Sequence, residues 1–510
     1  MIVPYTTLMS NDNTRNGVSR RDYLAAAGGA GATLGLAGCM GGGNGDGGGN
    51  GGGDDGTGEP IDTEPPEEDV TIQIAADSNF ANAAEDIKET LHEDGGLPDN
   101  ISIEFLAGSF TTGDRRSQYQ QILSAGQERP TVLMMDNGWT IPFIARGQLA
   151  NLSEELPGSI VDQVQSDYLS NMVATAQDTE GDLYGIPLFA DFPTIQYRKD
   201  LMREAGYTDE DFDTWATEPM TWSEFSTVVT DTLEATDTQD GFTWQGSAYE
   251  GLACCDFIEF MGSHGGSYFG EFENYFGPVG DRPVTVDEEN VINAVRMMRT
   301  FIHGQDDEHS LEGYDQISPQ AVVQYTEEPS REPFTNGNVV AHRNWPYSIN
   351  INGAEDVFGE DLGVMPIPYA VSEEDSPYSS IGGTTSALGG WHLTLNPNAN
   401  EDRKRAALQL FRALQEDEVR LRMFEIGGWT PPISDLINTE RTRELELIGR
   451  YVDTLQVAGE AALPRPVTTV WPQESSQIAS EVNDSLRQEK SPEQAMTDLK
   501  ESLESIESQA

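Results

Sequence analysis

Apolar runs and helical stripes alternate from residue 70 onward, and this alternation constrains the fold more than any other feature of the chain. Residues 70–75 switch between apolar and polar side chains, a period of two that predicts a strand. Two further strands are predicted over 101–105 and 131–136, with helices around Ile87 and Ile122 between them. This β-α-β-α-β order predicts an α/β fold with an open, largely parallel sheet.

Polar and glycine residues follow each of these strands. Ligands of open α/β sheets bind beyond the carboxyl ends of the strands. The sequence therefore predicts a ligand site where Asp77, residues 108–113 and residues 136–139 come together.

The later part of the chain has mainly helical patterns, with short strands predicted around residues 339–341 and 362–365. Thr221 and Ser491 each begin a capping-box pattern, with Glu or Gln three residues further on. Apolar side chains at helical spacing predict three buried helix faces. These are Val291, Val295, Met298 and Ile302; Ala407, Leu410, Phe411 and Leu414; and Ile478, Val482 and Leu486.

Acidic residues far outnumber basic ones, since 87 Asp and Glu oppose 29 Lys and Arg for a net charge of −58 over 510 residues. A surface this negative repels phosphate backbones, which excludes nucleic acid as a partner. High acidity with Lys at only five positions is typical of proteins that work in concentrated salt, where screening weakens self-repulsion. An acidic protein that awaits a basic partner is the alternative, and the even spread of acids along the chain disfavours it.

The N-terminus carries an export pattern. An arginine pair precedes a short apolar stretch that ends in Leu-Ala-Gly-Cys39. This pattern resembles a twin-arginine signal joined to a lipoprotein cleavage box, after which Cys39 is the lipid-carrying first residue. We therefore expect residues 1–38 to be the signal and residues 39–69, rich in Gly and acids, to be a flexible tether. No later stretch is apolar for about 18 residues, so lipid is the only membrane anchor predicted.

Patterns typical of catalysis are sparse. The other two cysteines, Cys254 and Cys255, are adjacent, and because a disulfide between neighbours closes a strained ring, they are predicted to be buried thiols. The six histidines have no zinc-ligand spacing, and the chain has no nucleophile elbow, phosphate-binding glycine loop or H-E-x-x-H pattern. We therefore expect no metal, no cofactor and no catalytic residue.

Aromatic residues carry the clearest hint of a ligand. Six lie at the ends of predicted segments or beside Gly and Pro: Trp139, Tyr197, Trp345, Tyr347, Trp391 and Trp429. Flat rings stack on the C–H faces of sugars, while nearby Asp, Glu and Arg hydrogen-bond to the hydroxyls. The pattern favours a carbohydrate ligand, although for any one ring packing in the core is an equally good interpretation.

Six sequence blocks occur in a characteristic order, at residues 191–201, 220–225, 245–252, 334–345, 363–368 and 389–391. Together they resemble extracellular solute-binding proteins of family 1, the maltose- and trehalose-binding type, which serve ABC transporters. With the export signal, the chain is similar to a haloarchaeal lipoprotein of this family.

The resemblance implies two α/β lobes of the type II periplasmic-binding-protein fold, with the ligand cleft between them. It assigns residues 70–188 and 360–414 to lobe one, and residues 192–358 and 416–510 to lobe two. It also implies a monomer on the extracellular face of the cell membrane. Its partners are then a small sugar, the permease subunits of the transporter and, through the lipid, the membrane.

The resemblance further implies roles for particular residues. Asp136 and Asp191 look like the family's acidic sugar ligands, and either Asp77 or Asn79 replaces the Glu that the family often has soon after the first strand. Thr111 and Arg116 resemble a hydroxyl-and-guanidinium pair that contacts the sugar. The other predicted ligand contacts are Trp139, Tyr197, Glu250, Trp345, Tyr347, Gly390, Trp391 and Trp429.

The predicted function is a non-catalytic receptor for an oligosaccharide such as maltose or trehalose, which closes on its ligand by a hinge. A receptor for another solute is the first alternative: a cleft dominated by carboxylates would favour a polyamine, and clustered Arg would favour glycerol phosphate. A surface glycosidase is the second, and it requires two carboxylates about 5–9 Å apart across the cleft. A purely structural surface lipoprotein is the third, and it has no need of paired lobes.

Overall fold

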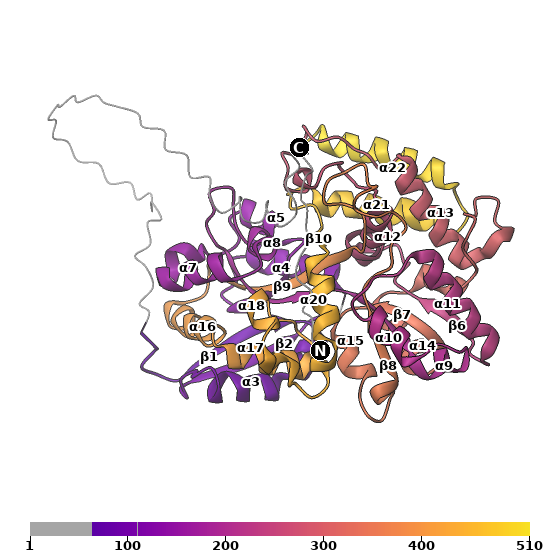
Figure 1. Ribbon diagram of the computed structural model, residues 1–510. Helices are drawn as coiled ribbons and strands as arrows, with labels where there is room; N and C mark the ends of the chain where they lie inside the picture. Colours follow the sequence, from indigo (N-terminus) through magenta and orange to yellow (C-terminus); the bar gives the residue numbers. More distant parts are fainter. Residues whose placement is uncertain (1–63, 110) are drawn as a thin grey trace, which may run out of the picture. The chain divides into compact units, whose positions relative to one another are not determined.

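The structure, a computed structural model, describes residues 64–109 and 111–510. The predicted signal, the predicted lipidation site Cys39 and most of the predicted tether lie outside the described residues. The described part folds into two α/β lobes, each built on its own sheet with helices around it (Figure 1). This confirms the predicted two-lobed α/β fold.

The first sheet has six strands in the order β10-β9-β3-β1-β2, with β4 also paired to β9. They are β1 (Val70–Ala76), β2 (Ile101–Ala107), β3 (Val132–Asp136), β4 (Gly185–Asp191), β9 (Ser386–Leu395) and β10 (Ala462–Pro464). The strands β1, β2 and β3 are parallel, as predicted, but β9 is antiparallel to β3 and β4. The sheet is therefore mixed, because β9 enters it from the second lobe and not through a crossover helix.

The second sheet has four strands in the order β6-β7-β5-β8. They are β5 (Thr194–Arg198), β6 (Asp240–Thr243), β7 (Val339–Asn344) and β8 (Leu362–Met365), so both strands predicted in this part of the chain are confirmed. The strand β8 belongs to this sheet and β10 to the first, whereas the predicted ranges put 360–414 in lobe one and 416–510 in lobe two. The lobe ranges as a whole stay a prediction.

Helices make up most of the remaining structure. The α-helices are α2 (Ser78–Asn82), α3 (Ala84–Glu93), α4 (Thr112–Ser124), α5 (Thr140–Ala145), α6 (Leu152–Glu155), α7 (Gly158–Asp167), α8 (Ser170–Ala174), α9 (Lys199–Glu204), α10 (Asp209–Trp215), α11 (Trp222–Ala235), α12 (Phe257–Ser263), α13 (Glu289–His303), α14 (Glu327–Thr335), α15 (Tyr347–Asn352), α16 (Glu401–Ala413), α17 (Asp417–Gly427), α18 (Ser434–Ile437), α19 (Glu440–Arg443), α20 (Val452–Glu460), α21 (Trp471–Leu486) and α22 (Pro492–Glu507). No helix among residues 64–109 and 111–510 combines the length and apolar character needed to cross a bilayer.

Local sequence signals explain several of these helices. The Thr221 hydroxyl accepts from the Glu224 backbone N–H at 3.2 Å, and the Glu224 carboxylate accepts from the Thr221 N–H at 2.8 Å, which confirms the capping box of α11. Ser491 caps α22 by accepting from the Gln494 N–H at 3.1 Å. The three predicted apolar stripes lie on α13, α16 and α21 and are buried.

The centre of the first sheet positions the candidate site. All of β3 is buried, because layers of side chains cover both faces of the sheet there. Beyond the carboxyl ends of β1 and β2, the helices α2 and α4 begin, and the chain crosses to the second sheet between β4 and β5. Side chains of both lobes meet at this edge.

Candidate functional site

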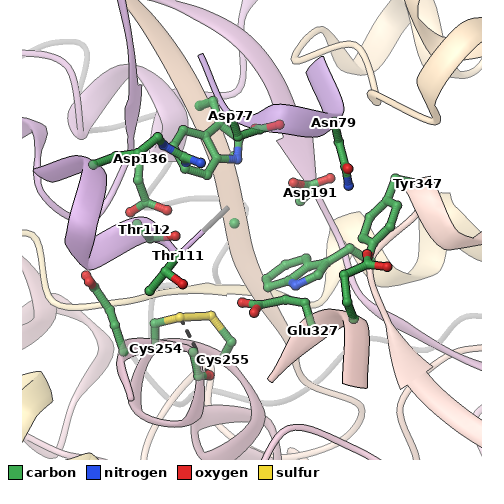
Figure 2. A pocket seen from close by; sticks show the side chains of 18 of the residues that line it. Asp77, Asn79, Thr111, Thr112, Asp136, Asp191, Cys254, Cys255, Glu327 and Tyr347 are labelled. Atoms are coloured by element: carbon green, nitrogen blue, oxygen red, sulfur yellow. Dashed lines mark hydrogen bonds between the residues drawn. A yellow bond between two sulfur atoms is a disulfide. The ribbon is translucent and has the colours of Figure 1, made fainter. Parts of the chain in front are cut away.

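A cavity of about 560 Å³ opens at the carboxyl edge of the first sheet. Its volume lies within the range of roughly 300–1,000 Å³ typical of small-molecule sites. Figure 2 shows Asp77 and Asp191 on one side of it, with Glu327, Cys254 and Cys255 of the second lobe on the other. Eleven of the thirteen predicted ligand contacts line it: Asp77, Thr111, Arg116, Asp136, Asp191, Glu250, Trp345, Tyr347, Gly390, Trp391 and Trp429.

The ends of the first parallel strands supply the polar floor of the cavity. Asp77 follows β1 and caps α2, its Oδ1 accepting from the Phe80 backbone N–H at 2.8 Å. Asp136 is the last residue of β3, and Thr111 immediately precedes α4. The side chains of Asp77, Asp136 and Thr111 all line the same cavity, because the carboxyl ends of parallel strands lie at one edge of a sheet.

Asp136 is held by a buried ion pair. Its Oδ1 accepts from Arg465 Nη1 at 2.6 Å and from the Gly138 N–H at 2.8 Å, and both charged side chains are less than a tenth exposed. A Cβ at position 138 would collide with the Arg465 guanidinium, so the pair needs glycine there. No sequence pattern indicated Arg465, because it lies 329 residues from its partner.

Asp191, at the end of β4, is surrounded by other acids. Burial raises its pKa to about 8, with Asp77 and Asp136 adding to the shift while Arg343 and Arg465 oppose it. Like charges nearby favour the protonated form of a carboxyl group. Near neutral pH, Asp191 therefore tends to keep its proton and can donate a hydrogen bond as well as accept one.

Replacing Asp191 with Asn should remove part of the pH dependence of stability. The carboxyl pKa rises from its ordinary 3.8 to about 8 on folding, so its contribution to stability is complete below the lower value and is lost as the pH approaches the upper one. Asparagine imitates the protonated form at every pH. The melting temperature of the wild type, measured in molar KCl, should therefore fall relative to that of Asp191→Asn between about pH 5 and pH 8. Parallel curves for the two proteins would contradict this assignment.

Six aromatic residues line the cavity: Phe189, Tyr249, Trp345, Tyr347, Trp391 and Trp429. The Arg115 guanidinium lies 4.4 Å from the Trp391 ring centroid, and that of Arg343 lies 4.6 Å from the Trp345 ring. A Cβ on Gly389 would lie 2.6 Å from the Trp345 ring, so glycine lets this ring pack directly on β9. Cations over the rings and bare backbone beneath them hold the aromatic surfaces in place before any ligand arrives.

Two predicted contacts lie away from the cavity, which corrects those predictions. Trp139 is fully buried beneath the site, with its ring 5.5 Å from Phe143 and 6.5 Å from Trp391. Tyr197 is buried in the second lobe against Phe212. An aromatic residue at the end of a strand or helix is not always exposed to a ligand. Its burial depends on which other segments of the chain pack over that end.

The second lobe adds charged side chains that sequence reasoning missed. In α14, Glu328 accepts from the Tyr347 hydroxyl at 2.7 Å and from Arg331 Nε at 3.1 Å. Burial raises the pKa of the neighbouring Glu327. Acidic residues are common in the first turn of a helix, because they interact favourably with the positive end of the helix dipole. Glu327 and Glu328 therefore did not indicate a ligand site in the sequence.

One ion pair joins side chains of the two lobes across the cavity. Arg116 on α4 lies 3.7 Å from Glu250, which follows β6 of the second sheet. Burial raises the pKa of Glu250, with Asp136 adding to the shift and Arg116 opposing it. Among residues 64–109 and 111–510, no group of three or more His, Cys, Asp or Glu is arranged to hold a metal ion.

Cys254 and Cys255 form a disulfide with each other, which corrects the prediction of two buried thiols. They lie in a π-helical turn, Leu252–Asp256, at the cavity wall. Neighbouring segments hold this turn, since the Tyr268 hydroxyl donates to the Ala253 carbonyl at 2.7 Å and Asp256 accepts from the Gln245 N–H at 2.8 Å. The sequence did not indicate this bond, because the residues that hold the turn in place, Tyr268 and Gln245, lie outside it.

Two lobes with a ligand-sized cavity between their sheets define a solute-binding protein. The sequence model of bacterial extracellular solute-binding proteins matches residues 91–446, which is more than half of the chain. The chain belongs to this family, whose members are the receptors of ABC transporters and are in general not enzymes.

Individual relatives agree with this assignment. The chain is 26% identical to a protein of Deinococcus radiodurans named as a probable ABC transporter-binding protein, over 77% of this chain and 83% of the relative. It is similar to maltose-bound MalE3 of T. maritima, with 25% identity, a TM-score of 0.70 and coverage of 85% of this chain and 98% of that one. It also resembles UgpB from Mycobacterium tuberculosis in complex with glycerophosphocholine, at 17% identity, a TM-score of 0.65 and coverage of 86% and 98%. This last likeness shows the fold alone.

Proposed function

We propose that this protein is a non-catalytic receptor for an oligosaccharide of the maltose or trehalose kind, which it delivers to an ABC permease. The observation that carries the proposal is the composition of the cavity wall. Trp345, Trp391 and Trp429 line it together with carboxyl and guanidinium groups from both lobes. Sugars need both surfaces at once, since their C–H faces pack on rings while their hydroxyl edges require donors and acceptors.

The charges of the cavity favour a neutral ligand. It has six carboxyl groups and four guanidinium groups along its wall: Asp77, Asp136, Asp191, Glu250, Glu327 and Glu328, with Arg115, Arg116, Arg331 and Arg465. Three of the carboxylates form ion pairs with three of the arginines, and burial among acids favours the protonated form of Asp191. A phosphate would need unpaired arginines, so the ion pairs within the wall disfavour it. A polyamine would need ionised carboxylates, and it is disfavoured because three of the six are ion-paired and burial raises the pKa of both Asp191 and Glu327. The likeness to maltose-bound MalE3 supports the same ligand class.

Closure around the ligand supplies the mechanism. A ligand that touches both walls binds the closed form more tightly than the open form and shifts the population toward it. Arg116 and Glu250 lie opposite each other across the cavity. Arg116 can donate a hydrogen bond to a ligand hydroxyl, and Glu250 can accept one from it. The permease can then distinguish a receptor that holds ligand from an empty one, because the ligand-bound receptor is closed.

Export and anchoring belong to the same proposal. The twin-arginine signal would carry the folded chain across the membrane, and lipid on Cys39 would hold this monomer at the extracellular face. The excess of acids suits a body that stays folded in concentrated salt.

Titration of tryptophan fluorescence in molar KCl tests the proposed function. Maltose, trehalose or maltotriose should give a saturable change, because Trp345, Trp391 and Trp429 all line the cavity. Spermidine and glycerol 3-phosphate serve as controls and should give none. A saturable response to either control, or silence for every sugar, would overturn the proposal.

A further inference from the structure

We infer that the Cys254–Cys255 disulfide is part of the ligand site, where it forms an apolar contact surface for the face of a bound sugar. Both cysteines line the cavity, and Figure 2 shows their sulfur–sulfur bond on the wall below Thr111 and beside Glu327. The inference rests on the proposed function and adds a contact on the second lobe.

The bond cannot serve as an ordinary structural crosslink. A disulfide stabilises a fold mainly by closing a loop in the unfolded chain, and this effect grows with the length of the loop. Here the sequence separation is one residue, so no loop is closed. What the bond changes is therefore local, namely the shape and chemistry of the turn that carries it.

That turn is held in position from several directions. The Tyr268 hydroxyl binds the Ala253 carbonyl, and Asp256 accepts from the Gln245 N–H while its other oxygen lies 3.2 Å from Arg343 Nη1. Cys254 Sγ lies 3.8 Å from the Gly251 carbonyl oxygen. The two sulfurs therefore form a preorganised surface and not a flexible side chain, which lowers the cost of binding.

The chemistry of the neighbouring wall explains why an apolar surface is useful there. Around the disulfide, Glu250 and Glu327 present polar carboxyl groups, and Thr111 presents a hydroxyl across from it. Sulfur is polarisable and apolar, and a disulfide has no S–H donor, so it suits C–H groups and not hydroxyls. Two thiols would instead present weak donors on side chains that rotate separately.

Reduction and substitution of the pair test this inference. Isothermal titration calorimetry with maltose, trehalose and maltotriose compares the oxidised protein, the same protein treated with a phosphine reductant, and a Cys254→Ala/Cys255→Ala variant. The phosphine supplies two electrons and becomes its oxide, water supplies the oxygen and two protons, and the S–S bond becomes two thiols. We expect affinity for the bound sugar to fall about fivefold in the reduced protein and in the variant, with little change in melting temperature.

Two controls separate the disulfide from other effects. A Cys39→Ser protein should bind like the wild type and respond to the reductant like the wild type. The double alanine variant should not respond to the reductant at all. If that variant fails to fold, the reduced wild type still provides the comparison, since its sequence is unchanged.

The outcomes distinguish the two proposals. Equal affinity in the oxidised and reduced proteins would overturn the disulfide contact and leave the sugar receptor intact. Peptide mapping of the unreduced protein after alkylation under denaturing conditions should find Cys254 and Cys255 unalkylated, and free thiols there would also overturn the contact. If the oxidised protein binds no sugar, the receptor proposal fails and the contact fails with it.

Discussion

Replacing Arg343 with Met should lower the free energy of unfolding by about 3–5 kcal/mol near neutral pH, because it leaves two acids buried without their cation. Arg343 donates from Nε to Glu259 at 2.7 Å, and its Nη1 lies 3.2 Å from Asp256. All three residues are at most 2% exposed. Glu259 also accepts from the Ala387 N–H at 3.1 Å, so the network joins β7 and α12 of the second lobe to β9 of the first sheet.

The pH dependence of stability provides a second test of the same network. Burial already raises the pKa of Asp256 to about 8, with Glu259 adding to the shift and Arg343 opposing it. Without Arg343 both acids would keep their protons to higher pH, and the folded state would lose stability as the pH rises. The destabilisation should therefore be smaller at about pH 5 than at about pH 8.

Urea unfolding in molar KCl measures this effect. Arg203→Met is the matched control, because Arg203 pairs with Asp209 and Asp361 at the surface and should cost at most about 1 kcal/mol. Adding Asp256→Asn and Glu259→Gln to Arg343→Met should restore part of the loss. A single variant that matches the Arg203 control would show that the buried network does not hold the lobes.

Replacing Trp391 with Ala should weaken sugar binding by about five- to thirtyfold, since one stacked ring contributes on the order of 1–2 kcal/mol. Trp391 lines the cavity from β9, and Arg115 lies over its ring. A Trp391→Tyr variant keeps an aromatic face and should lose less affinity. Calorimetric titration with the sugar identified by fluorescence provides the measurement.

A tryptophan outside the cavity controls for the loss of a large ring. Trp215 packs against Phe212 and Tyr207 in the second lobe and does not line the cavity. Trp215→Ala should therefore leave affinity unchanged, even if it lowers the melting temperature. Unchanged affinity in Trp391→Ala would remove this ring from the site.

Local patterns predicted the elements well because local interactions form them. The alternation of residues 70–75 became β1, and Thr221 capped its helix through bonds that span three residues. The pairing of β9 was not predictable in this way. Its partners β3 and β4 lie about 200 or more residues earlier in the chain, and nothing in its own pattern specifies them.

The residues of the candidate site also fall into two groups, those that local patterns predict and those that depend on tertiary packing. Asp77 and Asp136 were predicted because acids that end parallel strands share a sheet edge. Trp139 and Tyr197 had the same local signature as Trp391, yet distant side chains bury them. The chain alone could not separate these rings, since burial depends on how separate segments pack.

The sequence by itself determined the α/β alternation, the helix caps and the acids at the strand ends, because each depends on residues within a turn or two of one another. Only the tertiary structure decided that Arg465 pairs with Asp136, that Trp345 and Trp391 line the cavity, and that Cys254 and Cys255 are bonded there. These features arise where distant segments of the two lobes meet, and their geometry exists only once both sheets have formed.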